Sequence, residues 1–143
     1  MLFLKEHANM GAHYLDRRRH PMHIHESAED YLEAILRLRE QKGHVRSVDI
    51  AALLGVTKPS VSFAMKKLRE NEFIHMDQDN LITLTEKGEE IAMRVYDRHK
   101  TISTFLMKLG VEEAVAREDA CKLEHDISEE SFNALRRHLL KLQ

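Results

Sequence analysis

Residues 47–71 read SVDIAALLGVTKPSVSFAMKKLREN, the segment with the strongest indication of a known supersecondary motif. Its apolar side chains recur at helical spacing before and after the turn at 55–57. Ser47 or Asp49 can begin the first helix. Pro59 is tolerated in the first turn of the second helix, where no backbone donor is needed. Two short apolar-faced helices joined by a tight turn that contains glycine predict a helix-turn-helix.

The apolar pattern changes its period in residues 73–84. Two short apolar runs, 73–76 and 81–84, flank the polar turn 77–80. A strand, a polar turn and a second strand predict a hairpin. Because a hairpin directly after a helix-turn-helix is a wing, the sequence predicts a winged helix-turn-helix.

Further helices are expected on both sides of this unit. One runs from its cap Ser27 to about residue 41, a long one covers about 86–109, another about 112–126, and Ser128 caps the last. The predicted fold class is therefore mainly α: an N-terminal winged helix-turn-helix with a two-stranded wing, followed by an all-α dimerisation domain.

We divide the chain into three parts. Residues 26–88 form the DNA-binding domain, and residues 89–143 form the helical metal-binding and dimerisation domain. Residues 1–25 are a His- and Arg-rich extension without lasting periodicity. We interpret this extension as a tail, whether or not it is ordered, and not as the metal site, because His-rich tracts bind metal adventitiously.

Composition narrows the class of protein. The chain has 143 residues, a formal net charge of −2 and one cysteine, so no intrachain disulfide forms. A lone thiol suits a reducing compartment, and we expect the cytoplasm. No apolar run is long enough to cross a bilayer, and the N-terminus lacks a secretory pattern, so we expect no membrane partner. The charge is not basic enough to indicate nucleic-acid binding by itself.

The second helix of the predicted helix-turn-helix has the composition of a DNA-reading helix. Polar hydroxyls can reach bases or phosphates, lysines suit phosphates, and Phe63 can touch a thymine methyl, or else belongs to the core if the helix phase differs. The alternative is a helical hairpin with a solvated lysine face, but the wing favours double-stranded DNA as the partner. The candidate DNA-contacting residues are Thr57, Lys58, Pro59, Ser60, Ser62, Phe63, Lys66 and Lys67.

Cys121, Glu124 and His125 stand at helical positions i, i+3 and i+4, which share one face. A thiolate, a carboxylate and an imidazole are metal-ligand types, and an apolar core has no use for all three together. The alternative is a buried cysteine beside a solvated Glu-His pair.

Two more positions are candidates with strong alternatives. Asp30 and Glu33 share a face of the first helix, which can equally be a solvated acidic stripe. His99 lies near the apolar face of the long helix, where a histidine is usually half-buried and hydrogen-bonded.

Together these residues resemble the diphtheria-toxin-repressor family, which includes the manganese transport regulators. The resemblance runs from about Ser27 to the end of the chain. Its landmarks are SAEDYLE (27–33), the segment 57–67, LTEKG (84–88), Arg98-His99 and CxxEHxxS (121–128).

The resemblance implies a divalent-metal site and assigns its ligands. They are Asp30, Glu33, His99, Cys121, Glu124 and His125. Five of the six keep the ligand type of the manganese-responsive branch. Cys121 departs from it, since that branch has glutamate there and the iron-responsive branch has cysteine.

Other family features are not expected here. The ancillary site of the iron-responsive branch would need ligands where this chain has Ser103 and Arg117, which serve poorly. The chain also leaves no room for the additional SH3-like domain. We expect Mn²⁺ or Fe²⁺, one or two per subunit, because oxygen and imidazole ligands suit Mn²⁺ while a thiolate favours Fe²⁺, Co²⁺ or Zn²⁺.

The resemblance also implies a mechanism. Metal bound between the two domains acts as corepressor by fixing the spacing of two recognition helices in a homodimer on a palindromic operator of metal-homeostasis genes. Phe132, Leu135 and Leu139 on the last helix are the expected dimer contacts.

Two other functions compete with this one. A metal-independent winged-helix regulator would use the Cys, Glu and His residues structurally. A small metalloenzyme is disfavoured, because the chain has no HExxH motif, no Gly-rich phosphate loop and no second cysteine. We therefore expect neither enzymatic activity nor a small organic substrate.

Overall fold

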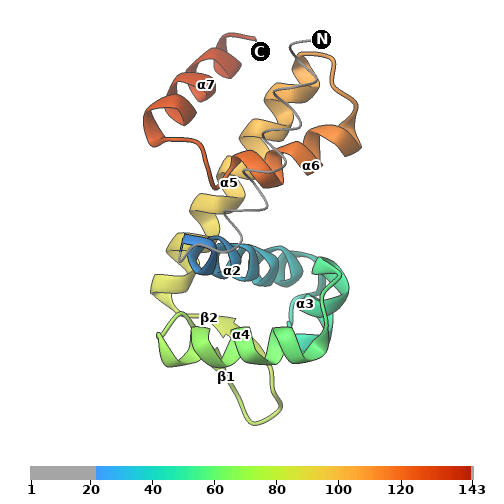
Figure 1. Cartoon of the computed structure of the whole chain (residues 1–143), viewed down its shortest axis with the longest axis vertical. Helices are drawn as coiled ribbons and strands as arrows, with labels where there is room; N and C mark the ends of the chain where they lie inside the picture. Colours follow the sequence, from blue (N-terminus) through green and yellow to red (C-terminus); the bar gives the residue numbers. More distant parts are fainter. Residues whose placement is uncertain (1–21, 143) are drawn as a thin grey trace.

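A computed structural model describes the backbone of residues 22–142 and the side chains of residues 27–142. This range is mainly helical with a two-stranded antiparallel sheet, which confirms the predicted fold class (Figure 1). The elements are α2 (Met22–Lys42), α3 (Ser47–Leu54), α4 (Lys58–Glu70), β1 (Ile74–Met76), β2 (Ile82–Leu84), α5 (Glu86–Lys108), α6 (Glu113–Leu123) and α7 (Glu129–Lys141).

Helices α3 and α4 form the predicted helix-turn-helix. Gly55 ends α3 at φ 65°, a left-handed conformation that costs glycine little. Thr57 caps α4 by accepting a backbone N–H three residues later. Helix α3 begins at Ser47, but its cap residue is Arg46, whose backbone N–H donates to Oδ2 of Asp49 at 2.9 Å.

The hairpin after α4 is the predicted wing. Ile74 of β1 pairs with Leu84 of β2 in antiparallel register. In the turn, Oδ1 of Asp77 accepts the backbone N–H groups of Asp79 at 2.8 Å and Leu81 at 2.9 Å. This side chain satisfies donors that a short polar turn would otherwise leave to water.

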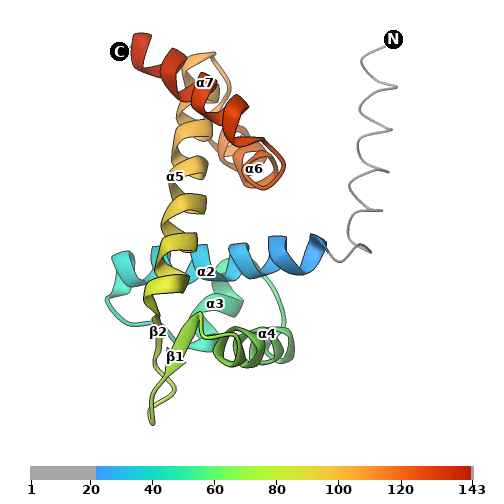
Figure 2. The same cartoon turned by 90° about the vertical axis from the view of Figure 1, so that its left-hand side faces the viewer.

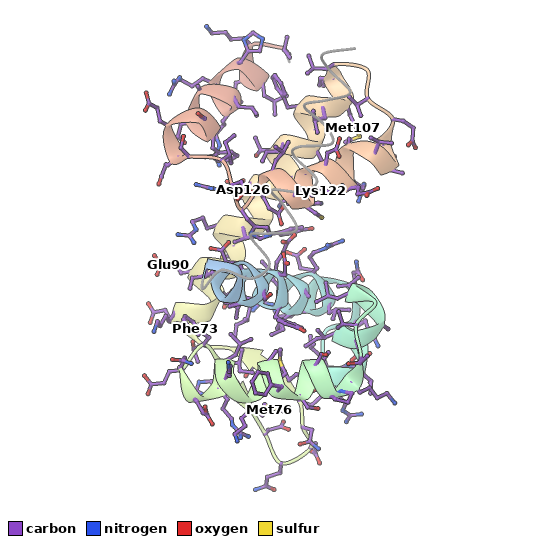
Figure 3. The ribbon with its side chains drawn as sticks, in the orientation of Figure 1. Phe73, Met76, Glu90, Met107, Lys122 and Asp126 are labelled. Atoms are coloured by element: carbon purple, nitrogen blue, oxygen red, sulfur yellow. The ribbon has the colours of Figure 1, made fainter. Side chains whose placement is uncertain are left out.

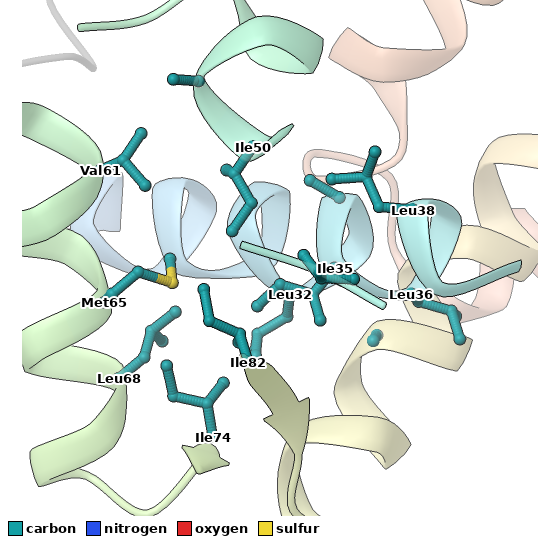
Figure 4. Packing of buried hydrophobic residues seen from close by; sticks show 14 residues of the cluster. Leu32, Ile35, Leu36, Leu38, Ile50, Val61, Met65, Leu68, Ile74 and Ile82 are labelled. Atoms are coloured by element: carbon teal, nitrogen blue, oxygen red, sulfur yellow. The ribbon is translucent and has the colours of Figure 1, made fainter. Parts of the chain in front are cut away.

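The main hydrophobic core lies beneath the reading helix (Figure 4). Burying each large apolar side chain there is worth about 1.5–3 kcal/mol relative to leaving it exposed. Side chains from α2 through the start of α5 contribute, so α2 is the central helix of the N-terminal unit. The largest are Leu32, Ile35, Leu36, Leu38, Val45, Ile50, Val61, Met65, Leu68, Ile74 and Ile82.

Helix α5 connects this unit to the rest of the molecule. Figure 2 shows it as a long column that α2 crosses near its lower end, with α6 and α7 at its upper end. Its first turn packs tightly on the wing, because a Cβ on Gly88 would lie 2.0 Å from the carbonyl oxygen of Phe73. At the upper end, Ile102, Ala120 and Phe132 form a second buried cluster.

Two element boundaries differ from the sequence-based expectation. Helix α2 begins at Met22, so Ser27 lies inside the helix and does not cap it. Helix α6 ends at Leu123, short of the expected 126. The extension 1–25 falls mostly outside the described residues, which begin at residue 22.

Within residues 22–142, no single helix has the length and apolarity to cross a bilayer. Only α3 and α4 taken together reach that threshold, and a bend of 119° separates them.

Candidate metal centre and DNA-reading face

The predicted ligands come from four places in the chain and meet between α2 and α5. Asp30 and Glu33 lie on α2, His99 on α5, Cys121 on α6, and the pair Glu124-His125 just after α6. The structure brings their donor atoms into two groups, His99 with Cys121 and Glu124, and Asp30 with Glu124 and His125. In each group the donor atoms lie within 4.8 Å of one another. Glu124 belongs to both.

The first group is centred on His99. Its Nδ1 lies 3.0 Å from Oε2 of Glu124 and 3.6 Å from Sγ of Cys121. His99 and Glu124 are buried, whereas Cys121 keeps part of its surface exposed. Burial lowers the pKa of His99, so the imidazole is held in the neutral form that binds metals. Burial, with the charges of Glu124 and Glu33, raises the pKa of the Cys121 thiol to about 12.

The second group is centred on His125. Its Nε2 lies 2.7 Å from Oδ1 of Asp30 and 3.4 Å from Oε1 of Glu124. Its Nδ1 lies 2.9 Å from Oε2 of Glu29. Burial opposes the charged form, but hydrogen bonds to Asp30 and Glu29 outweigh it and raise the pKa of His125 to about 10. An imidazolium therefore lies among these carboxylates when no metal is bound.

Glu33 lies beside both groups. Its side chain is 5% exposed, Arg37 approaches Oε1 only to 3.9 Å, and this oxygen has no hydrogen-bond partner. Oε1 of Glu124 also lacks one. Burial, with a hydrogen bond to Glu124 and its charge, raises the pKa of Glu33 to about 8, and burial raises that of Glu124 to about 7.

Two buried, unpartnered carboxylate oxygens need an explanation, since an uncompensated buried carboxylate is costly. A divalent cation would supply the missing partner to both. The residues present therefore fit a metal, with oxygen, nitrogen and sulfur donors available to it.

The structure contradicts two of the alternative explanations given for these residues. The solvated acidic stripe is wrong for Glu33, which is buried because α5 packs across α2 on that side. The solvated Glu-His pair is wrong because the Glu124 side chain is 0% exposed and that of His125 is 3%. Helix α6 ends at Leu123, but Glu124 keeps a helical backbone conformation and its N–H donates to the carbonyl oxygen of Ala120, so Glu124 stays near Cys121. His125 follows in the turn and belongs to the other ligand group.

Sequence reasoning missed two residues of this centre. Glu29 contacts His125 and also accepts a hydrogen bond from Arg94 at 3.1 Å. Arg98 donates to the backbone carbonyl oxygens of Glu124 at 3.2 Å and of Ile127 at 3.0 Å, which fixes the turn after α6. Both lie within landmarks of the family resemblance, SAEDYLE and Arg98-His99, but the resemblance assigned neither of them a role.

The outer face of α4 carries the candidate DNA-contacting residues. Phe63 is 62% exposed, so the alternative that it belongs to the core is wrong. Lys67 places its Nζ 4.5 Å from the centroid of that ring. The Thr57 hydroxyl lies 2.8 Å from the hydroxyl of Ser60 and caps α4, so it stabilises the first turn of this helix. All eight candidates are exposed: Thr57, Lys58, Pro59, Ser60, Ser62, Phe63, Lys66 and Lys67.

Two of the three expected dimer contacts are buried within their own chain. Phe132 is 4% and Leu139 is 7% exposed within their own chain, so these side chains have almost no surface left for a second subunit. The guanidinium carbons of Arg98 and Arg136 lie 5.3 and 4.7 Å from the centroid of the Phe132 ring. Leu135 is half-buried and keeps some surface. Larger exposed apolar side chains in this part of the chain are Leu109, Val115, Leu123, Leu140 and Leu142.

Two family models match this chain. The model for the iron dependent repressor N-terminal DNA binding domain matches residues 23–80. The model for the iron dependent repressor metal binding and dimerisation domain matches residues 85–143.

Curated relatives agree with these matches. The transcriptional regulator MntR of Escherichia coli O157:H7 is 40% identical over 114 residues, covering 80% of this chain and 74% of that protein. The HTH-type transcriptional regulator MntR of Bacillus subtilis strain 168 is 36% identical over 109 residues, covering 76% of this chain and 77% of that protein.

Solved structures share the fold. The manganese regulator SloR superposes with a TM-score of 0.70 at 33% identity, covering 78% of this chain and 53% of that one. IdeR of T. acidophilum superposes with a TM-score of 0.71 at 27% identity and the same coverage. The chain thus spans about half the length of these solved structures.

Proposed function

The chain belongs to the diphtheria-toxin-repressor family of metal-dependent DNA-binding repressors, and from this premise we propose that Mn²⁺ or Fe²⁺ is its corepressor at metal-homeostasis genes. The family consists of transcriptional regulators and not of enzymes. Its members bind DNA and carry a dimerisation domain, so DNA and a second copy of the chain are its partners.

One observation carries the proposal. The two carboxylate oxygens of Glu124 face two different ligand groups, Oε2 toward His99 and Oε1 toward His125. The metal-holding residues would be Asp30, Glu33, His99, Cys121, Glu124 and His125. A divalent cation, when bound, supplies positive charge among these carboxylates. Because Glu124 is shared, the arrangement supports one or two ions per subunit.

These residues join two parts of the chain. Asp30 and Glu33 belong to α2, whose other side forms the core beneath α4. Glu124 and His125 belong to the turn after α6, which Arg98 holds against α5. Ligands drawn from both parts would fix how α4 sits relative to the dimerisation helices.

In a homodimer this arrangement sets the distance between two reading helices. Half-sites of a palindromic operator recur about 34–36 Å apart, so DNA affinity depends on that distance. Metal that prefers the DNA-competent arrangement raises DNA affinity, and DNA tightens metal binding by the same factor. A cytoplasmic location suits a DNA-binding regulator with one free thiol.

The two ligand groups differ in donor type because only one of them contains Cys121. The group of His99 includes a thiol, whereas the group of His125 offers only oxygen and nitrogen donors. A thiolate favours Fe²⁺, Co²⁺ and Zn²⁺ over Mn²⁺. We therefore keep both Mn²⁺ and Fe²⁺ as candidate signals.

The test is DNA binding by fluorescence anisotropy on a palindromic promoter fragment, titrated anaerobically with Fe²⁺, Mn²⁺ and Zn²⁺ against a chelator control. We expect metal to raise affinity at least about tenfold, the low side of typical allosteric couplings. Glu124→Ala should abolish the rise. Glu90→Ala is the matched control, because Glu90 is exposed on α5 away from the ligands (Figure 3).

Equal affinity with chelator and with metal would contradict the corepressor mechanism. That result would favour a metal-independent winged-helix regulator in which the Cys, Glu and His residues are structural.

A further inference from the structure

Glu29 contacts the metal centre without belonging to either ligand group. Its Oε2 lies 2.9 Å from Nδ1 of His125, on the opposite side of the ring from Asp30 and Glu124. Its other oxygen, Oε1, accepts a hydrogen bond from Arg94 of α5 at 3.1 Å. The carboxylate is thus held at both ends between α2 and α5, whose crossing is visible in Figure 2.

A histidine ligand needs its other ring nitrogen fixed. A carboxylate that accepts the Nδ1–H hydrogen bond sets the ring orientation and leaves Nε2 free to bind metal. His125 has this arrangement, since Nε2 faces Asp30 at 2.7 Å while Nδ1 faces Glu29. Its side chain is only 3% exposed, so water cannot easily replace the carboxylate.

We propose that Glu29 is a positioning residue: its carboxylate, braced by Arg94, holds the His125 ring so that Nε2 points at the metal. The inference rests on the proposed function, because it concerns the same centre. It adds a residue that binds no metal itself and acts through His125.

A direct ligand role for Glu29 is the competing explanation. The carboxylate reaches His125 from the Nδ1 side, and its second oxygen is engaged by Arg94. Neither oxygen lies in the groups of donor atoms that converge within 4.8 Å. The geometry therefore favours positioning over ligation.

The test compares Glu29→Ala and Glu29→Gln with wild type in the full-length protein. Mn²⁺ affinity is measured by calorimetry, and Co²⁺ is used as a spectroscopic probe of ligand geometry. Losing a residue that orients a ligand typically weakens metal affinity about 10–100-fold, and we expect that loss for Glu29→Ala. Glu29→Gln should recover most of it, because the amide oxygen still accepts the Nδ1–H hydrogen bond.

Glu90→Ala and Glu90→Gln remove the same charge at an exposed position and serve as matched controls. Equal losses in Glu29→Ala and Glu29→Gln would overturn the proposal, since a ligand or a bulk charge effect predicts that pattern. Wild-type affinity in Glu29→Ala would overturn it as well.

A second readout separates this inference from the proposed function. With diamagnetic Zn²⁺ bound, nitrogen-15 spectra of the His125 ring should show the proton on Nδ1 in wild type and in Glu29→Gln, and a changed pattern in Glu29→Ala. Wild-type protein that binds none of these metals would contradict the proposed function. Wild-type protein that binds metal while Glu29→Ala leaves the ring unchanged would contradict the positioning role alone.

Discussion

Nδ1 of His99 lies 3.0 Å from Oε2 of Glu124, although 25 residues separate them in sequence. The other oxygen of the same carboxylate lies 3.4 Å from Nε2 of His125 and accepts no hydrogen bond. One buried side chain therefore faces two sets of potential ligands.

Glu124→Gln should remove metal binding without harming the metal-free fold. The amide keeps the shape of the carboxylate but removes a charge whose pKa burial has raised to about 7. We therefore expect an unchanged or higher Tm without metal. In wild type, metal at 100 times its Kd stabilises the fold by about 2.7 kcal/mol, and this gain should vanish in the variant. Thermal melts with and without Mn²⁺ measure both effects, with Glu90→Gln as the control. A normal metal-induced shift in Glu124→Gln would contradict the shared-ligand role.

Metal binding should release protons and strengthen as pH rises. The pKa of Glu33 is raised to about 8 and that of His125 to about 10, so both groups hold protons at pH 7 in the metal-free protein. A metal that takes these atoms as ligands must displace those protons. Each displaced proton raises the apparent affinity about tenfold per pH unit, up to pH 8 for Glu33 and toward pH 10 for His125.

Calorimetry at pH 7 in buffers of different ionisation enthalpy counts the released protons. Glu33→Gln should release fewer than wild type, because its amide carries no titratable proton. A binding enthalpy that does not depend on the buffer would show that these groups are not ligands.

The helix-turn-helix and its wing could be predicted from the sequence because their signals are local. Gly55 at the turn, the polar run after Met76 and Thr85 before a long amphipathic helix each act within a few residues. Local signals fail where packing decides the outcome. Helix α2 begins at Met22, before the expected cap Ser27, because a residue that can cap a helix can also lie inside one.

The candidate centre was predicted residue by residue only through resemblance, and its geometry could not be predicted. Spacing predicts that Cys121, Glu124 and His125 share a helical face, and Cys121 and Glu124 do meet, whereas His125 in the turn after α6 joins a different group. Glu29 could not be found from the pattern, because its role depends on a contact 96 residues away in sequence. The dimer contacts could not be predicted for a similar reason. Hydrophobic periodicity shows that the last helix is apolar on one face, but not whether that face packs on its own chain or on a partner. Phe132 packs on its own chain.

Cys121→Glu should shift the metal preference toward Mn²⁺. Sγ of Cys121 lies 3.6 Å from Nδ1 of His99, in the ligand group that also contains Glu124. Replacing the thiol with a carboxylate makes every donor in both groups oxygen or nitrogen, which suits Mn²⁺ better than Zn²⁺. We expect the ratio of the Mn²⁺ Kd to the Zn²⁺ Kd to fall at least about tenfold.

Two measurements check the role of this thiol. Competition titrations give the ratio of affinities, and Co²⁺-loaded wild type should show near-ultraviolet sulfur-to-metal charge transfer that Cys121→Glu and Cys121→Ser lack. Identical Co²⁺ spectra in wild type and Cys121→Ser would mean that the thiol binds no metal.

Phe63→Ala and Lys66→Ala should weaken DNA binding in different ways. Lys66 is exposed on α4 and suits a phosphate, so its loss should weaken binding to all sequences and reduce the slope of log affinity against log salt by about one. Phe63 is uncharged and 62% exposed, so its loss should leave that slope nearly unchanged. If its ring contacts bases, operator binding should fall by about 1–3 kcal/mol while non-specific binding changes little.

Lys67 complicates this separation, since its Nζ lies 4.5 Å from the Phe63 ring centroid. Removing the ring frees the lysine, so the effects of Phe63→Ala and Lys67→Ala should not add in a double-mutant cycle.

Fluorescence anisotropy with metal present, on operator and scrambled DNA across a salt series, measures all of these quantities. Because these side chains are exposed, the Tm of each variant should stay near wild type, which separates lost DNA contacts from lost stability. If Phe63→Ala weakens binding to operator and to scrambled DNA equally, the ring does not recognise bases. At that position α4 would then contact only the phosphate backbone.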